Sequence, residues 1–223
     1  KNKLNKFIFS STGSVYGNVS SQINIPENHK KKLLNPYSDS KYKLENHLIS
    51  LSNENKISAI ILRYFNVAGA DIKNRSGLIT NPDNLIKAIC EVATGKRKEL
   101  IVNGNDYKTK DGTTIRDYIH VSDLAEMHVL AADNLIKKNK TDIYNCGYGT
   151  GFSIGDVISS MNKILNKEIK IKYGPRREGD AEYSVSDNTK FLNEFNWSPK
   201  MNNLDQILTT SLNWEKTVKK IFN

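Results

Sequence analysis

The early part of the chain contains two continuous apolar runs, and each of them ends in polar residues. The first is "FIFSS" at residues 7–11, and the second is "SAIILRY" at residues 58–64. Continuous rather than alternating apolar character predicts strands that are buried on both faces, as in a parallel sheet. We expect the first strand to open at its carboxyl end into a polar loop at residues 12–17.

A helix is predicted between the two strands. Asn35 and Pro36 form a typical helix start, with asparagine as the cap and proline at the first helical position. Leu44, Leu48 and Leu51 then follow at helical spacing. Strand, helix and strand together make a βαβ unit with a right-handed crossover. Ligands of such sheets bind beyond the carboxyl ends of the strands, so the residues that follow both strands are candidates for a site.

The rest of the sequence mixes helical and strand patterns, so we expect an α/β fold without internal repeats. The glycines of "GYGTG", Gly147 and Gly149, have the wrong spacing for a dinucleotide-binding loop and predict a turn instead. Helical patterns occupy residues 84–94, 121–137, 154–165 and 205–219, and strand patterns occupy residues 100–103, 118–121, 143–146 and 169–173.

The charge balance limits the class of partner. The chain has 33 basic and 24 acidic residues and a net charge of +9, which suits nucleic acid, a membrane surface or a phosphorylated small molecule. Because the lysines are scattered, we expect a compositional bias with no nucleic-acid and no membrane partner. Cys90 and Cys146 lie far apart without metal-ligand spacing, which predicts neither a disulfide framework nor a zinc site and fits a reducing cytoplasm.

The sequence gives no sign of membrane insertion or secretion. No apolar run approaches the length of a membrane span, and no signal peptide precedes the first strand pattern. The chain starts at Lys1 rather than methionine, and its first apolar run begins only a few residues later. We therefore expect a piece of a longer protein.

Tyr37 and Lys41 are the first candidate catalytic residues. They lie four residues apart in the predicted helix and therefore share one face. An ammonium group near a phenol lowers the tyrosine pKa and makes a usable general base. Thr12, in the loop after the first strand, is placed to meet Tyr37 over the sheet edge and to relay a proton. A solvated helix start beside an unrelated loop hydroxyl is the alternative, and the spacing alone does not decide between them.

The neighbouring motifs resemble a known family. The stretches "FIFSSTGSVYG", "NPYSDSK" and "LRYFNVAGA" resemble the extended short-chain dehydrogenase/reductases. "GNDYKTKDGTTIRDYIHVSDLAEMH", "YNCGYGTGFSIGDVI", "PRREGDAEYSVSD" and "FNWSPKMNNLDQIL" look like the UDP-glucose 4-epimerase branch of that family. The resemblance covers the whole chain, with the motifs in the same order.

The resemblance implies the C-terminal part of a Rossmann-type doubly wound parallel sheet plus a smaller α+β substrate-binding lobe. Residues 1–72 would be the remaining part of the NAD-binding domain. Residues 73–223 would form mainly the UDP-sugar-binding lobe, with about 115–137 returning to the Rossmann domain. The Gly-rich loop that holds the NAD pyrophosphate in this family does not occur in the sequence. We therefore expect a start near the fifth strand of that domain, and poor NAD binding by this fragment.

The same resemblance implies roles for residues at the predicted sheet edge. Tyr37 matches the catalytic base, and Lys41 matches the lysine that lowers its pKa and holds the nicotinamide ribose. Thr12 matches the residue that bonds the sugar 4-hydroxyl. The matching positions beside cofactor and substrate are Tyr64, Phe65 and Asn66.

A nucleotide site is implied in the second half of the chain. Arg116 and Arg177 match the two arginines on the diphosphate, to which a planar guanidinium is well suited. Asp180 matches the acid on the uridine ribose, and Ser184 matches the residue that limits the sugar pocket. Asn84 resembles an asparagine on the diphosphate, and the strand along the uracil would contain Ile101, Val102 and Asn103.

The activity implied is that of a homodimeric UDP-glucose 4-epimerase in galactose metabolism or surface-polysaccharide precursor supply. It would interconvert UDP-galactose and UDP-glucose through a 4-keto intermediate, with hydride passing to NAD and back. Gly13 and Ser14 follow Thr12 where a sugar-nucleotide dehydratase needs an Asp-Glu pair, which argues against dehydration. UDP-glucuronate remains an alternative substrate, and the small Ser184 would also admit a UDP-N-acetylhexosamine.

Two further alternatives belong to other classes of protein. The chain would be a non-catalytic truncated relic if no Gly-rich strand-turn-helix precedes it in the gene. It would be a basic scaffold if it bound nucleic acid in a salt-dependent way. His120 and His128 are expected to be structural.

Overall fold

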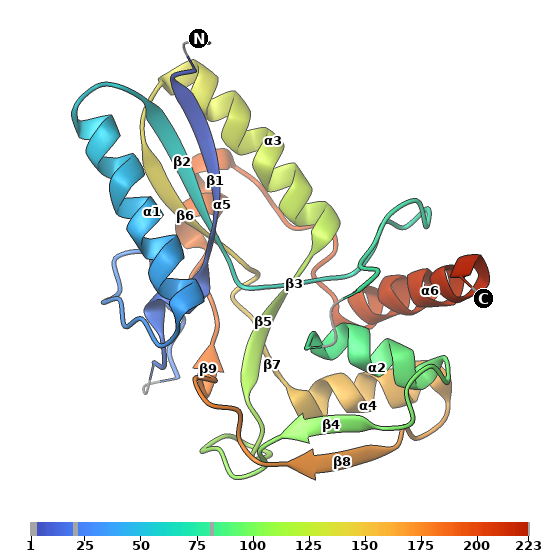
Figure 1. Ribbon diagram of the computed structural model, residues 1–223. Helices are drawn as coiled ribbons and strands as arrows, with labels where there is room; N and C mark the ends of the chain where they lie inside the picture. The colour runs from blue at the N-terminus through green and yellow to red at the C-terminus, as the bar shows by residue number, and fades with distance from the viewer. Residues whose placement is uncertain (1–3, 20–21, 81–82, 223) are drawn as a thin grey trace.

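The computed structural model describes residues 4–19, 22–80 and 83–222. The fold is α/β, and Figure 1 shows it as two lobes that are joined by the long strand β5 (Ile115–His120). Among the described residues, no helix is both long and apolar enough to cross a membrane.

The first lobe contains a three-stranded parallel sheet in the order β1-β2-β6. Its strands are β1 (Lys6–Thr12), β2 (Ser58–Tyr64) and β6 (Asp142–Cys146). Helix α1 (Pro36–Asn53) lies on one side of the sheet and helix α3 (Val121–Lys138) on the other (Figure 1). The successive residues of β2 from Ser58 to Arg63 are all buried, as a strand covered on both faces requires. The predicted βαβ unit is confirmed.

Helix α1 begins where the sequence predicts. Asn35 caps it by accepting a hydrogen bond from the Ser38 backbone N–H at 2.8 Å, and the Ser38 hydroxyl closes a capping box. Pro36 occupies the first helical position, where a missing N–H costs nothing. This start fixes where the first turn of α1, which contains Tyr37, lies along the sheet.

The second lobe contains a four-stranded and a two-stranded sheet. In the first, β5 pairs with β3 (Asn66–Ala68), β7 (Gly151–Ser153) and β9 (Tyr183–Ser184). In the second, β4 (Leu100–Asn103) pairs with β8 (Ile171–Gly174) in parallel. The helical elements not yet named are η1 (Gly13–Tyr16), α2 (Leu85–Ala93), α4 (Ile154–Leu165), α5 (Thr189–Phe195) and α6 (Leu204–Phe222).

Several predicted boundaries are wrong. The strand expected at 118–121 runs over 115–120, because Val121 already belongs to α3 and the His120 ring caps that helix. The strand expected at 169–173 runs over 171–174, and the last helix extends over 204–222 instead of 205–219. The predicted loop at 12–17 contains the short helix η1. Four elements were not predicted, namely β3, β7, β9 and α5.

A buried ion pair fastens α1 to the first sheet. Arg63 on β2 and Glu45 on α1 are both fully buried, and two hydrogen bonds of 2.6 and 3.0 Å join them. Ser11 on β1 also donates to Glu45, and the second guanidinium edge of Arg63 donates to the Tyr16 hydroxyl at 2.8 Å. One network therefore ties α1, both strands and η1 together just below the carboxyl ends of the strands.

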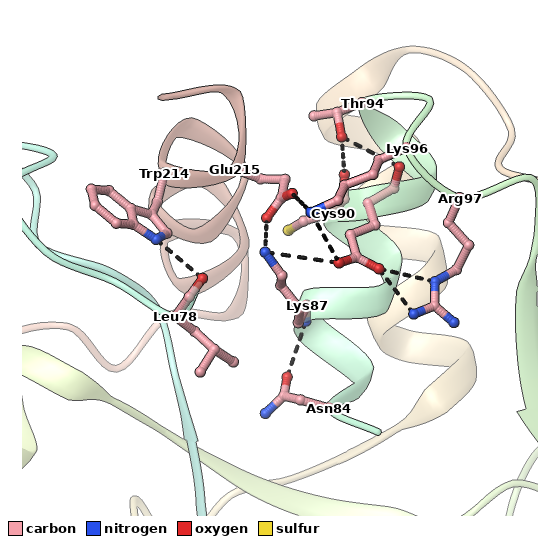
Figure 2. A network of polar contacts seen from close by, with 10 residues as sticks. Leu78, Asn84, Lys87, Cys90, Thr94, Lys96, Arg97, Trp214 and Glu215 are labelled. Atoms are coloured by element: carbon pink, nitrogen blue, oxygen red, sulfur yellow. Dashed lines mark hydrogen bonds and ion pairs between the residues drawn. The ribbon is translucent and has the colours of Figure 1, made fainter. Parts of the chain in front are cut away.

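A second buried ion pair joins α6 to α2, as Figure 2 shows. Lys87 on α2 donates to Glu215 on α6, and both side chains are almost completely buried. Trp214 also donates from its indole N–H to the Leu78 carbonyl oxygen at 3.1 Å. These contacts hold α6 and the loop at 69–80 against α2.

Removing one partner of the first buried pair is expected to destabilise the protein strongly. Glu45→Gln leaves the Arg63 charge buried without its counter-charge, which costs about 3–5 kcal/mol of unfolding free energy. Glu54→Gln is the control, because it breaks an exposed pair with Lys56 and is expected to cost less than about 1 kcal/mol. Urea unfolding of both variants measures the difference, and equal losses would contradict the role given to Glu45.

Candidate active site

A cleft of about 250 Å³ lies where the two lobes meet. It opens at the carboxyl ends of β1 and β2, and its far wall is formed by β5 and by the segment 177–184. Leu34 and Asn35, which immediately precede α1, also line it. The predicted site residues that line this cleft are Thr12, Tyr64, Phe65, Asn66, Arg116, Arg177, Asp180 and Ser184.

Two arginines face one carboxylate in the cleft. Arg177 donates to Asp180 at 2.9 Å, and the Arg116 guanidinium lies 3.7 Å from the same Asp180 oxygen. Burial lowers the pKa of Arg116 while Asp180 opposes that shift, and the hydrogen bond with Asp180 raises the pKa of Arg177. Two guanidinium groups with a single counter-charge leave the cleft net positive, which suits a phosphate-bearing ligand.

Arg116 is held in place by its neighbour Asp117. The Asp117 carboxylate is fully buried and accepts backbone N–H bonds from Tyr148 at 2.8 Å and Gly149 at 3.0 Å. The Ser186 N–H and hydroxyl donate to it as well, at 3.1 and 2.6 Å. These bonds join β5, the glycine turn and the segment after β9 around one carboxylate.

The Asp117 contacts also explain the glycine turn. A Cβ atom on Gly147 would lie 2.3 Å from an Asp117 oxygen, so only glycine fits there. The N–H groups that follow it are already bonded to Asp117, so they do not form a phosphate-binding loop. Asp117 was not among the site residues predicted from the sequence, because the position of its carboxylate depends on contacts with residues far away in the chain.

Thr12 and Tyr37 are not joined directly among the described residues. Thr12 is buried in the cleft, and its hydroxyl donates to Ser14 Oγ at 3.1 Å. The Tyr37 side chain is 55% exposed and does not line the cleft. Lys41 lies one turn further along α1, and its ammonium donates to the Ser10 carbonyl oxygen at 2.8 Å. That ammonium lies 5.8 Å from the centre of the Tyr37 ring.

Some predicted nucleotide-binding residues lie outside the cleft. Asn84 caps α2 by accepting the Lys87 N–H at 3.0 Å, and it lines a second cavity of about 890 Å³ that shares Phe65 and Asn66 with the cleft. The strand β4, with Ile101, Val102 and Asn103, pairs with β8 and lines neither of these cavities. The structure therefore does not bring these four residues together with the two arginines.

The second cavity lies between the loop at 69–80, α2 and α6. Its polar wall includes the Lys87–Glu215 pair, and Trp214 closes it against Leu78 (Figure 2). The buried Lys87–Glu215 pair was not predicted, although the lysine in the otherwise apolar stretch "LIKAIC" is a sequence signal that could have indicated it. Within the described part of the chain, no cluster of three His, Cys, Asp or Glu side chains is placed to hold a metal ion.

The NAD dependent epimerase/dehydratase family matches residues 1–147. A UDP-glucose 4-epimerase of Azospirillum brasilense is 38% identical over 218 residues, which cover 97% of this chain and 62% of that protein. The chain thus spans less than two thirds of the length of this curated relative.

Solved structures resemble the chain over a similar extent. A UDP-glucose 4-epimerase from Stenotrophomonas maltophila, with bound NAD and formylated UDP-arabinopyranose, has a TM-score of 0.93 and 31% identity. It is matched over 97% of this chain and 65% of that chain. A UDP-Glc/GlcNAc 4-epimerase from Campylobacter jejuni has a TM-score of 0.76 and 40% identity, and the match covers 96% of this chain and 65% of that one.

These matches agree with the α/β fold of the chain. The family match covers the sheet edge, α1 and the cleft residues Thr12, Asn66 and Arg116. The chain belongs to the NAD dependent epimerase/dehydratase family.

Proposed function

We propose that this chain forms the catalytic and UDP-sugar-binding part of a UDP-glucose 4-epimerase that uses NAD. The observation that carries the proposal is the cleft in which Arg116, Arg177 and Asp180 face Thr12. A site for a nucleotide diphosphate and a site for a sugar hydroxyl are therefore adjacent. The named relatives, which act on UDP-sugars, support the same reading.

The residues at the sheet edge fit the nicotinamide end of NAD. The exposed Tyr37 and the half-buried Lys41 lie on one face of α1 and leave a phenol and an ammonium accessible to ribose hydroxyls. When bound, NAD supplies a reversible hydride acceptor. The one glycine turn that resembles a dinucleotide loop is occupied by Asp117, so we propose that residues 1–72, with 115–137, contribute only part of the NAD site.

The nucleotide end of the substrate is held by three side chains. Arg116 and Arg177 bind the diphosphate oxygens, and Asp180 turns from the arginines to the ribose hydroxyls. Because this anchor lies away from the reacting carbon, it retains the nucleotide while the 4-keto sugar rotates. Asn84 lines the adjoining cavity, which shares Phe65 and Asn66 with the cleft.

Tyr37 and Thr12 transfer the proton of the sugar 4-hydroxyl. Thr12 hydrogen-bonds the sugar 4-hydroxyl, and the Tyr37 phenolate takes its proton and later returns it to the other epimer. The Lys41 ammonium, 5.8 Å from the Tyr37 ring centre, supplies positive charge beside that phenolate. Rotation of α1 side chains toward the bound sugar brings the Tyr37 hydroxyl to the cleft, which begins at Leu34 and Asn35.

The region after Thr12 supports epimerisation over dehydration. A Cβ atom on Gly13 would lie 3.1 Å from the Phe65 ring, so an acidic side chain there would crowd the cleft. We further propose a homodimeric, cytoplasmic full-length enzyme, on the family resemblance alone.

Loss of one cleft arginine is expected to weaken nucleotide binding. Arg177→Met removes a charge-assisted contact worth about 1.5–3 kcal/mol, which is roughly a 10- to 100-fold rise in the Kd for UDP. Calorimetric titration of UDP measures it. Arg97→Met is the matched control, because Arg97 pairs with Glu91 at 2.9 Å outside the cleft. Equal UDP affinity in both variants would contradict the proposed anchor.

Substitution of the proposed base is expected to abolish most of the turnover. Tyr37→Phe removes a general base, and a loss of about 10²–10⁴-fold in kcat follows. The assay is conversion of UDP-galactose to UDP-glucose with added NAD, on the chain expressed with any in-frame coding sequence upstream of Lys1. Tyr173→Phe, at a similarly exposed tyrosine, is the control. Absence of turnover in the unsubstituted protein would favour a truncated relic.

The pocket at Ser184 is expected to admit N-acetylated sugars. Ser184 is small and lines the cleft, and the Campylobacter jejuni relative is named for both UDP-Glc and UDP-GlcNAc. Ser184→Tyr should abolish turnover of UDP-N-acetylglucosamine while UDP-galactose turnover persists. Parallel assays of both substrates decide this, and unchanged selectivity would refute it.

A further inference from the structure

A chain of hydrogen bonds runs from α3 to the end of β1, next to the proposed catalytic pair. Ser10 and Tyr64 lie on the sheet face that α3 covers, and the Tyr64 hydroxyl is 2.7 Å from Ser10 Oγ. The same hydroxyl hydrogen-bonds with His128 Nε2 on α3. The rings of Tyr64 and His128 meet edge to face with their centres 5.4 Å apart. From the sequence, His128 was expected to be structural, and no role was predicted for Ser10.

The other nitrogen of His128 determines which atom of the ring carries the proton. His128 Nδ1 lies 2.7 Å from the Leu124 carbonyl oxygen. A carbonyl oxygen only accepts hydrogen bonds, so Nδ1 must carry the hydrogen. In the neutral ring Nε2 is then an acceptor, and the Tyr64 hydroxyl donates its proton to it.

The direction of the Tyr64–His128 hydrogen bond fixes the direction of the next one, between Tyr64 and Ser10. A tyrosine hydroxyl has one proton, so Tyr64 has none left for Ser10 and instead accepts from the Ser10 hydroxyl. Burial raises the pKa of Tyr64, and the hydrogen bond with Ser10 opposes that shift only in part, so Tyr64 keeps the proton that it donates. The proton of exposed Ser10 therefore points inward, and the outward lone pair of Ser10 Oγ is free to accept.

The main chain of Ser10 also contacts Lys41, the proposed cofactor-binding lysine. The Lys41 ammonium, on the α1 side of the sheet, donates to the Ser10 carbonyl oxygen at 2.8 Å, whereas Ser10 Oγ lies on the face that α3 covers. An acceptor at Ser10 Oγ is complementary to a group that donates a hydrogen bond, such as a hydroxyl or a primary carboxamide.

We propose that His128 is a positioning residue that acts through Tyr64 to fix Ser10 Oγ as a hydrogen-bond acceptor for a hydroxyl or carboxamide of the bound ligand. The identity of that ligand rests on the proposed function, since NAD carries both groups and UDP-galactose carries hydroxyls. The direction of the hydrogen bonds rests only on the geometry of this chain.

The first test needs no ligand. Long-range nitrogen–proton NMR spectra of residues 1–223 near neutral pH should show a His128 ring that is protonated at Nδ1 and bare at Nε2. Tyr64→Phe should shift the Nε2 signal, because it removes the donor. A ring protonated at Nε2 would overturn the proposal, whatever the chain binds.

The second test measures binding with NAD and with UDP-galactose in separate titrations, on the chain with any in-frame upstream coding sequence. Ser10→Ala and His128→Leu should each raise the Kd of one of the two ligands by roughly 5- to 10-fold. His128→Gln, whose amide oxygen can accept from Tyr64, should restore much of the affinity. The Kd of the other ligand should stay unchanged, and that contrast identifies which ligand meets Ser10.

The outcomes separate this inference from the proposed function. If the unsubstituted protein binds both ligands and Ser10→Ala changes neither Kd, the inference fails while the proposed function stands. If the unsubstituted protein binds neither, the proposed function fails and the ligand contact with it. Thermal unfolding of each variant gives a second check, because a purely structural His128 would lower the melting temperature of His128→Leu and leave the Kd of the folded protein unchanged.

Discussion

The arrangement of the cleft depends on one buried carboxylate. Within the described part of the chain no cation pairs with Asp117, and instead four hydrogen bonds from two distant segments solvate its carboxylate. Burial raises the pKa of Asp117, and those four bonds from oriented N–H and O–H groups partly oppose that shift. Arg116 precedes it in β5 and pairs in register with Ser184, so both cleft residues take their positions from this contact.

The two lobes use buried ion pairs for a comparable purpose. Arg63–Glu45 fixes α1 on the first sheet, and Lys87–Glu215 fixes α6 on α2. Apolar contacts would supply as much stability, since desolvation offsets much of the attraction between buried charges. A charge pair, however, is satisfied in only one alignment of the two elements. That alignment sets where the first turn of α1 stands relative to the strand ends.

The helices and strands whose ends are marked by local sequence patterns could be predicted from the sequence. The strands at 58–64 and 100–103 and the helix at 154–165 match the structure to the residue, because apolar runs and caps mark both ends of each. β3, β7 and β9 have three residues or fewer and exist through their pairing with β5, which no local pattern reveals. The arginines and Asp180 were found through family resemblance, whereas the roles of Asp117 and Ser10 depend on partners far away in the chain.

Asp180 is the counter-ion of both arginines, Arg116 and Arg177, and therefore competes with an anionic ligand for them. This carboxylate already neutralises part of the charge of the two guanidinium groups, so in the proposed function an incoming diphosphate displaces it by anion exchange. On that proposal, Asp180 returns to the arginines when the nucleotide leaves. A carboxylate three residues along the chain from Arg177 would thus act as an internal counter-ion that competes with the bound nucleotide.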